Sequence, residues 1–372
     1  MVRPQAEVDA RVATAPRESG SLVLFADLAR LAGSASRQTA HPDQGERVFV
    51  REIVAALNRQ VSVAVYSTSR EDSPLFHQVA VSRLLSPRLL AAIWKLRPAA
   101  VLYVYPLTPA ALVRARLLKA AARGAPVVVV AISSHTVGER ARRAMRRLWP
   151  DLAVVSSTAE RDRLAAEGCT VELLPPAIDL DTFRPASSDE KIELRRKWRL
   201  PLDADLVLHV GHLVPARNLP ALIAVAARPN TAVVMLASGV RHPESDRLRR
   251  ELETHGVVVL TGYRPDVAEL YRAADCYLFP SNSWGGGIDL PLSVLEAMAS
   301  DLPVASTSFG ALPELFAGAE GILFADDAAE LPALVDGLLR ARPHTRPLVV
   351  GYSWEALAAH LVSLVKVVRH TV

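Results

Sequence analysis

Residues 277–315 read YLFPSNSWGGGIDLPLSVLEAMASDLPVASTSFGALPEL and form the most informative region of the chain. Their pattern predicts, in order, a strand, a glycine-rich loop, a helix, a second strand, a loop and a second helix. Gly285, Gly286 and Gly287 let the backbone approach a ligand closely. Pro291 suits the first turn of the next helix, whose free N–H groups and dipole favour an anion. The region therefore predicts an α/β unit that holds an anion at its loop.

Glu296 lies about one turn into that helix. A carboxylate does not suit a phosphate, but it suits a diol because it accepts two hydrogen bonds from adjacent ribose hydroxyls. The alternative is a flexible loop that precedes an ordinary helix with a surface glutamate. The residues alone leave both interpretations open.

The same alternation extends outward over the rest of the chain in two blocks, which predicts two doubly wound parallel sheets facing each other across a cleft. Strands are expected at 22–26, 61–66, 100–105, 127–132, 153–156 and 171–174, and again at 206–210, 232–236, 257–260, 276–279, 304–306 and 321–324. Helices are expected at 46–57, 87–96, 109–122, 137–148 and 159–167, and again at 217–226, 244–254, 266–273, 292–299, 312–316, 328–339 and 354–368.

A polar, proline-punctuated stretch at 184–205 interrupts the alternation and predicts a linker with one short helix. We therefore divide the 372 residues into a loose tail at 1–20, a first Rossmann-like domain at 21–185 and a second at 186–350. Residues 351–372 are expected to form a helix that packs back towards the first domain. Ligands of open α/β sheets bind beyond the carboxyl ends of the strands, so the cleft is the expected site.

Composition narrows the class of protein. Half of the residues are apolar, and the excess of Arg over Lys with abundant Ala is typical of GC-rich bacterial genomes. The two cysteines, Cys169 and Cys276, lie in or beside apolar stretches, which favours a reducing cytoplasm over a disulfide framework. No signal peptide or membrane-spanning run is evident, and nothing indicates nucleic-acid binding.

The net charge is only +4, but arginines concentrate at 140–147. One interpretation is a solvated helix face. The other is a patch for anionic lipid or for a phosphorylated acceptor, and thus peripheral contact with the inner face of the membrane.

Five blocks of this sequence resemble one enzyme family, the retaining GT-B glycosyltransferases of family four. The blocks occur in the family's order and cover the C-terminal half almost continuously. They are LLPPAIDLDTFRP (173–185), HVGHLVPARNL (209–219), TGYRPDVAELYRAADCYLFPS (261–281), PLSVLEAMASDLPVASTSFGALPEL (291–315) and YSWEALAAHLVSLV (352–365).

The resemblance implies a site for a nucleoside-diphosphate sugar. Glu296, the second acid of the family's E-x7-E motif, would bind the donor ribose, and the backbone of Leu292, Ser293 and Val294 would lie near the diphosphate. The family's basic pair corresponds to His212 and Arg217. Arg217 keeps the charge and can bind phosphate through two N–H groups, whereas a neutral His212 donates only one hydrogen bond.

The first acid of the motif is displaced in this chain. Ile288 stands eight residues before Glu296, and Asp289 follows it after a longer loop. Asp289 would hold the transferred sugar if the loop shifts the register. Otherwise the backbone of Gly286 and Gly287 would have to hold it, or the chain would bind without catalysing.

Further site residues are implied more weakly by the resemblance. Gly45 would open the first helix and allow donor phosphate or acceptor to approach. His135 would face the sugar as a catalytic residue, its alternative being a cap for the helix that follows. Tyr263 and Arg264 would lie next to the nucleotide base.

The Asp179-Leu180-Asp181 triplet resembles a metal-binding D-x-D, but its place in the interdomain segment favours turn chemistry and helix capping. No zinc-ligand spacing is present. The resemblance implies a hexosyltransferase that transfers sugar with retention and needs neither metal nor cofactor, only the nucleotide sugar and an acceptor. The alternatives are a degenerate nucleotide-sugar-binding protein and another GT-B enzyme, such as an epimerase or a phosphorylase.

Overall fold

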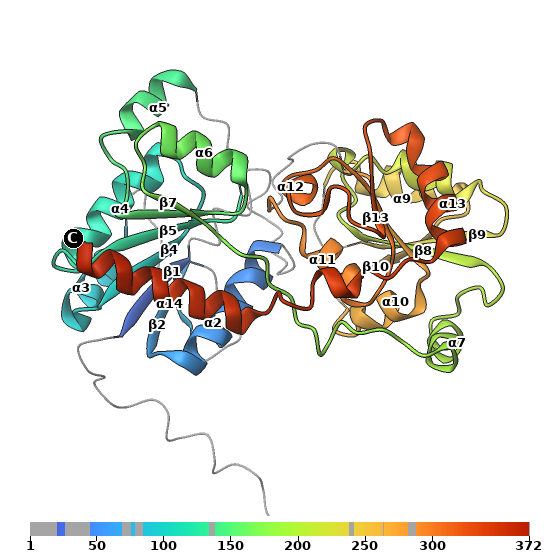
Figure 1. Cartoon of the computed structure of the whole chain (residues 1–372), viewed down its shortest axis with the longest axis horizontal. Helices are drawn as coiled ribbons and strands as arrows, with labels where there is room; N and C mark the ends of the chain where they lie inside the picture. Colours follow the sequence, from blue (N-terminus) through green and yellow to red (C-terminus); the bar gives the residue numbers. More distant parts are fainter. Residues whose placement is uncertain are drawn as a thin grey trace, which may run out of the picture.

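The computed structural model describes residues 21–26, 45–68, 76–78, 85–133, 138–237, 242–262, 264–281 and 288–371. These residues form two α/β domains placed side by side (Figure 1). Every strand pairing among them that belongs to a sheet is parallel. The predicted fold class, two doubly wound parallel-sheet domains, is confirmed.

Within the described ranges the first sheet has seven strands in the order β3-β2-β1-β4-β5-β6-β7. Alternate residues of an inner strand, β1, enter different cores: Leu22 and Leu24 pack on one face, Val23 and Phe25 on the other. Helices therefore cover both faces. The strands are β1 (Leu22–Ala26), β2 (Val63–Ser67), β3 (Phe76–Gln78), β4 (Ala100–Val104), β5 (Val127–Ala131), β6 (Leu152–Val155) and β7 (Val171–Leu173). The helices are α2 (Gly45–Gln60), α3 (Pro87–Leu96), α4 (Pro109–Ala121), α5 (Glu139–Met145) and α6 (Thr158–Ala166).

The second sheet has six strands in the described part of the chain, in the order β10-β9-β8-β11-β12-β13. Its strands are β8 (Asp205–Gly211), β9 (Thr231–Ala237), β10 (Val258–Thr261), β11 (Cys276–Phe279), β12 (Val304–Thr307) and β13 (Ile322–Ala325). Its helices are α7 (Ser188–Lys197), α8 (Pro220–Ala226), α9 (Ser245–Thr254), α10 (Val267–Ala273), α11 (Leu292–Ala299), α12 (Leu312–Phe316) and α13 (Leu331–Ala341), with the 3₁₀ turns η1 (Pro215–Arg217), η2 (Ala328–Glu330) and η3 (Arg346–Leu348).

Besides small shifts at element ends, four details differ from the prediction, one being that the helix expected at 328–339 divides into η2 and α13. Strand β3 was not predicted, since it is a three-residue edge strand with exposed His77 and Gln78. The helix expected from Arg217 begins only at Pro220, because Asn218 adopts a left-handed conformation (φ 51°) that separates η1 from α8. The arginine-rich helix is shorter than expected and ends at Met145.

In the part of the chain that the structure describes, two segments connect the domains, and they lie side by side. Ile178 forms a parallel bridge with Ser353. Arg346 donates to the carbonyl oxygens of Phe183 (2.9 Å) and Leu180 (3.1 Å), which joins the second crossing to the first. The crossing is therefore a double connection.

After the second crossing, α14 (Trp354–Thr371) lies along α2 of the first domain (Figure 1). The rings of Trp354 and Phe49 meet edge to face at 5.6 Å, and Leu357 and Leu361 are buried in the same core. The last helix thus belongs to the core of the N-terminal domain.

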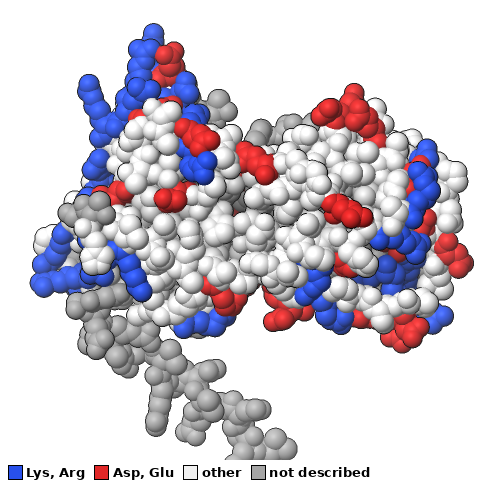
Figure 2. Space-filling view, in the orientation of Figure 1, with Lys and Arg blue, Asp and Glu red and all other residues white. Residues whose placement is uncertain are grey.

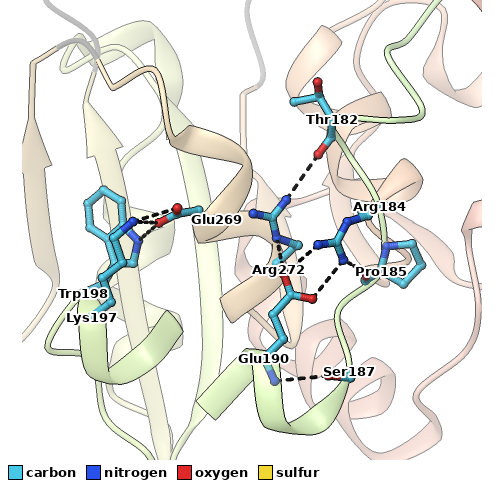
Figure 3. A network of polar contacts seen from close by, with 9 residues as sticks. All are labelled: Thr182, Arg184, Pro185, Ser187, Glu190, Lys197, Trp198, Glu269 and Arg272. Carbon is cyan, nitrogen blue, oxygen red and sulfur yellow. Dashed lines mark hydrogen bonds and ion pairs between the residues drawn. The ribbon is translucent and has the colours of Figure 1, made fainter. Parts of the chain in front are cut away.

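Polar contacts anchor the first crossing to the second domain (Figure 3). Arg184 makes two hydrogen bonds of 2.9 Å to the carboxylate of Glu190 on α7, and Arg272 on α10 lies 3.1 Å from the same carboxylate. The Asp179 carboxylate accepts from the backbone N–H groups of Asp181 and Thr182. These bonds show the turn chemistry expected of the D-x-D triplet.

Both cysteines are buried free thiols, and burial raises the pKa of Cys169 and of Cys276 to about 12. Within the described ranges, no helix combines the length and the apolar character needed to cross a membrane.

Candidate functional site

The candidate site lies where the strand order of the second sheet reverses. Strands β8 and β11 are neighbours there, and their chain continues outward in opposite directions along the sheet. Arg217, from the loop after β8, donates through Nη1 to Oγ of Ser281, just after β11, at 3.3 Å. A switch point of this kind is where open α/β sheets bind ligands.

Helix α11 follows β11 and begins after Pro291, which has no polar side chain to cap it. The backbone of Leu292 and Ser293 therefore opens the helix with N–H groups suited to an anion. Val294 is buried and its N–H donates to the carbonyl of Pro291 at 3.1 Å. The three residues predicted to lie near the diphosphate thus form the first turn of α11.

Glu296 lies one turn into α11 and is partly buried. Its Oε2 accepts a hydrogen bond of 2.6 Å from the phenol of Tyr271 on α10. Burial raises the pKa of Glu296 to about 7, and the Tyr271 hydrogen bond opposes that rise. Glu296 is therefore an acid of the buried site rather than a surface residue.

Tyr277 on β11 joins the helix to the end of β8. Its phenol donates to the carbonyl of Val210 at 3.3 Å and is hydrogen-bonded to the Ser293 side chain. Burial raises the pKa of Tyr277, so the phenol is neutral. Sequence reasoning missed both tyrosines, because each read as an ordinary apolar residue.

The site carries one permanent cation in its described part, Arg217. Burial and, to a lesser extent, the charge of the neighbouring Arg217 lower the pKa of His212 to about 4, so His212 is neutral at pH 7. His209 on β8 is wholly buried, its Nδ1 bonds the carbonyl of Leu278 at 2.9 Å, and burial lowers its pKa to about 4 as well. A guanidinium beside neutral imidazoles can bind a phosphate.

Glu46 faces this cation from the other domain. It occupies the first turn of α2 and is 4% exposed. Burial raises its pKa to about 7, while its own backbone N–H and the charge of Arg217 lower it. The sequence contained a signal for this residue, an acid directly after Gly45 at a helix start, but its proximity to Arg217 was not foreseen.

Asp289 lies between the two domains and is 1% exposed. Its N–H donates to the carbonyl of Ile132 in the first domain at 3.0 Å, and its carbonyl accepts from Ala311 in the second at 2.9 Å. The structure thus places Asp289 at the junction of the two domains, with its backbone held by both of them.

Ile288, eight residues before Glu296, packs against the first domain. A Cβ placed on Gly45 would lie 3.2 Å from Cδ1 of Ile288, so the space over this glycine is taken by the loop end of the second domain. Approach of a phosphate or acceptor to Gly45 stays a prediction. An apolar cavity of about 30 Å³ adjoins this contact, with Phe49, Leu174 and Leu290 in its wall.

The remaining predicted residues contribute less to the described geometry. Arg264 is exposed, with its guanidinium 5.5 Å from the ring centre of Trp198. His135, Tyr263, Gly286 and Gly287 lie outside the described residues.

Comparison with known proteins identifies the second domain. Residues 204–341 match the family described as glycosyl transferases group 1. The chain is 26% identical over 272 residues to a GDP-mannose-dependent monoacylated alpha-(1-6)-phosphatidylinositol monomannoside mannosyltransferase of Corynebacterium glutamicum, covering 65% of this chain and 71% of that protein. It is 30% identical over 236 residues to a D-inositol 3-phosphate glycosyltransferase of Frankia alni, covering 55% of this chain and only 56% of that protein.

The whole chain also resembles solved structures. The fold of sucrose-phosphate synthase from Thermosynechococcus elongatus superposes with a TM-score of 0.70 at 17% identity, covering 95% of this chain and all of that one. At this identity the likeness concerns the fold alone. The second domain thus matches the glycosyl transferases group 1 over residues 204–341, and the chain is a glycosyltransferase with the GT-B fold.

Proposed function

We propose that this chain transfers a hexosyl group from a nucleoside-diphosphate sugar to an acceptor, with retention at the anomeric carbon. The observation that carries the proposal is that Arg217 and Glu296 both lie near the Tyr277 phenol, with Ser281 bonded to Arg217, at the switch point of the family-matched domain. A fixed cation, a buried carboxylate and an open helix start at one end of the sheet suit a ligand that carries both a diphosphate and a ribose.

In this proposal Glu296 accepts hydrogen bonds from the ribose hydroxyls, and Arg217 and the first turn of α11 bind the diphosphate. Arg217 and the N–H groups of that first turn also stabilise the negative charge that develops on the leaving phosphate, because they are already in place before the reaction. Neutral His212 donates a single hydrogen bond. The proposal needs no protein nucleophile, and the leaving phosphate itself takes the proton of the acceptor hydroxyl. It needs no metal because Arg217 and the helix N–H groups offset the charge of the diphosphate.

For the donor, the relative from Corynebacterium is named GDP-mannose-dependent, which makes GDP-mannose the first sugar nucleotide to test. Both relatives carry an inositol phosphate group in their names, so we include a phosphorylated polyol among the acceptors. The acceptor would enter from the N-terminal domain, with Asp289 and His135 next to the transferred sugar.

The test is incubation with GDP-mannose and with UDP-glucose, in the presence of inositol phosphates, followed by analysis of the products. Transfer that continues in EDTA and yields an α-linked product from an α-configured donor supports the proposal. Binding without transfer or hydrolysis would instead identify a degenerate binding protein. A product without a new glycosidic bond would indicate an epimerase or a phosphorylase.

We further propose peripheral contact of the N-terminal domain with anionic membranes. Arg140, Arg143, Arg146 and Arg147 are exposed on and after α5, and Figure 2 shows blue side chains crowding this end of the domain. Cationic residues near an anionic bilayer contribute about 1 kcal/mol each. Co-sedimentation with phosphatidylglycerol vesicles that disappears on Arg140→Glu/Arg147→Glu supports the contact, and retained sedimentation would contradict it.

A further inference from the structure

Tyr271 lies beneath the candidate ribose site and has no assigned role. It is wholly buried on α10, and its phenol donates to Oε2 of Glu296 at 2.6 Å. A hydrogen bond of this length to a carboxylate is a strong, charge-assisted one. The contact therefore fixes one oxygen of Glu296 from the protein side.

Packing holds the Tyr271 ring in place. Phe183 meets it edge to face with the ring centres 5.4 Å apart, and Tyr277 stacks on it at 5.7 Å with the planes inclined by 27°. A side chain clamped between two aromatic rings has little freedom to turn. The position of the phenol oxygen is therefore set by the core of the domain rather than by a ligand.

The other end of this aromatic stack reaches the phosphate side of the site. Tyr277 bonds the carbonyl of Val210 at the end of β8 and the side chain of Ser293 at the start of α11. One rigid pair of rings thus contacts the carboxylate expected at the ribose and the helix turn expected at the diphosphate.

We propose that Tyr271 is a positioning residue for nucleotide recognition: it anchors one oxygen of Glu296 so that the carboxylate meets both hydroxyls of the ribose. The inference rests on the proposed function, because it takes Glu296 as the ribose ligand. It goes beyond it by assigning ribose selectivity to a residue that does not touch the nucleotide.

The experiment compares ribonucleotides with nucleotides that lack the diol. GDP and UDP are each titrated calorimetrically against their 2′,3′-dideoxy analogues, with wild-type protein and with Tyr271→Phe. We expect Tyr271→Phe to weaken binding of the ribonucleotide about tenfold while leaving the affinity for the dideoxy analogue unchanged, as the loss of one charge-assisted hydrogen bond would do. A merely structural role would weaken both ligands alike and would overturn the proposal.

Two further variants complete the design. Glu296→Gln should lose the same ribose preference, and the double variant should lose no more, because the two residues act on one interaction. Tyr103→Phe removes an equally buried phenol oxygen from the first domain and should leave both affinities unchanged.

The pH dependence gives a readout that folding alone does not move. Among the residues that the structure describes, the titratable groups that face Glu296 are Tyr271 on α10 and Tyr277 on β11. Without the Tyr271 hydrogen bond the pKa of Glu296 rises above its value of about 7. As the pH is lowered, Glu296 of the variant is therefore protonated earlier, and its ribonucleotide affinity should begin to fall at a higher pH than that of the wild type.

Failure of the inference differs from failure of the proposed function. A wild-type protein that binds ribo and dideoxy nucleotides equally would remove Glu296 from the ribose, and Tyr271 with it. A wild type that prefers the ribonucleotide, together with a Tyr271→Phe protein that keeps the full preference, would overturn the role of Tyr271 alone.

Discussion

The environment of Glu46 is made by both domains. It is buried at the start of α2, and the charge of Arg217 on the second domain acts on it. Its pKa of about 7 means that folding opposes its ionisation, since the charged form loses water that Arg217 only partly replaces.

The stability of the protein should therefore depend on Glu46 as the pH rises. Because its folded pKa lies above the unfolded value of 4.5, its destabilising effect grows from about pH 4.5 and levels off above about pH 7. We expect Glu46→Gln to raise the free energy of unfolding by roughly 1–3 kcal/mol at pH 8 and by much less at pH 5. Urea titrations at both pH values measure this, and an equal gain at both would contradict it.

Asp289 is the residue on which catalytic competence depends in the proposed function. We expect Asp289→Asn to reduce turnover about 10- to 100-fold, the loss of one charge-assisted hydrogen bond to the sugar, while nucleoside-diphosphate affinity changes little. Steady-state kinetics and calorimetry separate the two effects. A fully active Asp289→Asn protein would mean that another group holds the sugar.

At the scale of elements, the loop before α12 packs closely against Asp289, which lies between β11 and α11. Gly310 has φ 59°, and a Cβ there would lie 2.0 Å from the carbonyl oxygen of Asp289. Only a glycine lets the two loops meet while Ala311 donates to that same carbonyl.

We expect Gly310→Ala to lower the free energy of unfolding by about 2–4 kcal/mol, since strain in a left-handed conformation adds to the clash. Gly318→Ala is the matched control: its φ is 78°, but nothing lies within 4 Å of the added Cβ. That control should lose only about 1 kcal/mol in the same denaturant titration. Equal losses of unfolding free energy in the two variants would show that the close contact with Asp289 adds nothing to the cost of the Gly310→Ala change.

Element by element, the sequence predicts most of this fold. Strands such as β5 and β11 are continuous apolar runs, and their type and order follow from that local pattern. Strand β3 was not predicted because three residues are too few to show a periodic pattern. The break between η1 and α8 was not predicted because the left-handed conformation of Asn218 depends on the loop that packs around it.

At the scale of the whole molecule, one carboxylate joins the two domains. Glu314 on α12 accepts hydrogen bonds from Oγ of Ser157 (2.9 Å) and from the backbone N–H groups of Thr158 (2.5 Å) and Ala159 (3.3 Å) at the start of α6. These bonds lower the pKa of Glu314 although burial raises it. A residue of the second domain therefore caps a helix of the first.

We expect Glu314→Ala to weaken the contact between the two domains by roughly 1–2 kcal/mol, the usual contribution of a helix cap. Small-angle X-ray scattering should show a larger radius of gyration, and the wild type should open in the same way once the pH falls through the lowered pKa of Glu314. Glu193→Ala, an exposed change on α7, is the control. Unchanged scattering in Glu314→Ala would show that other contacts keep the domains together.

Local pattern alone determined the alternation of strands and helices, the division into two domains and the stretch that carries Glu296. These features follow from apolar periodicity and from glycine and proline chemistry, which act over a few neighbouring residues. Tertiary structure alone decided that Tyr271 anchors Glu296, that Glu46 faces Arg217 and that Asp289 lies between Ile132 and Ala311. Each of these pairings joins residues from different elements, so it exists only once sheets and helices have packed, and burial then sets the pKa values that local sequence cannot.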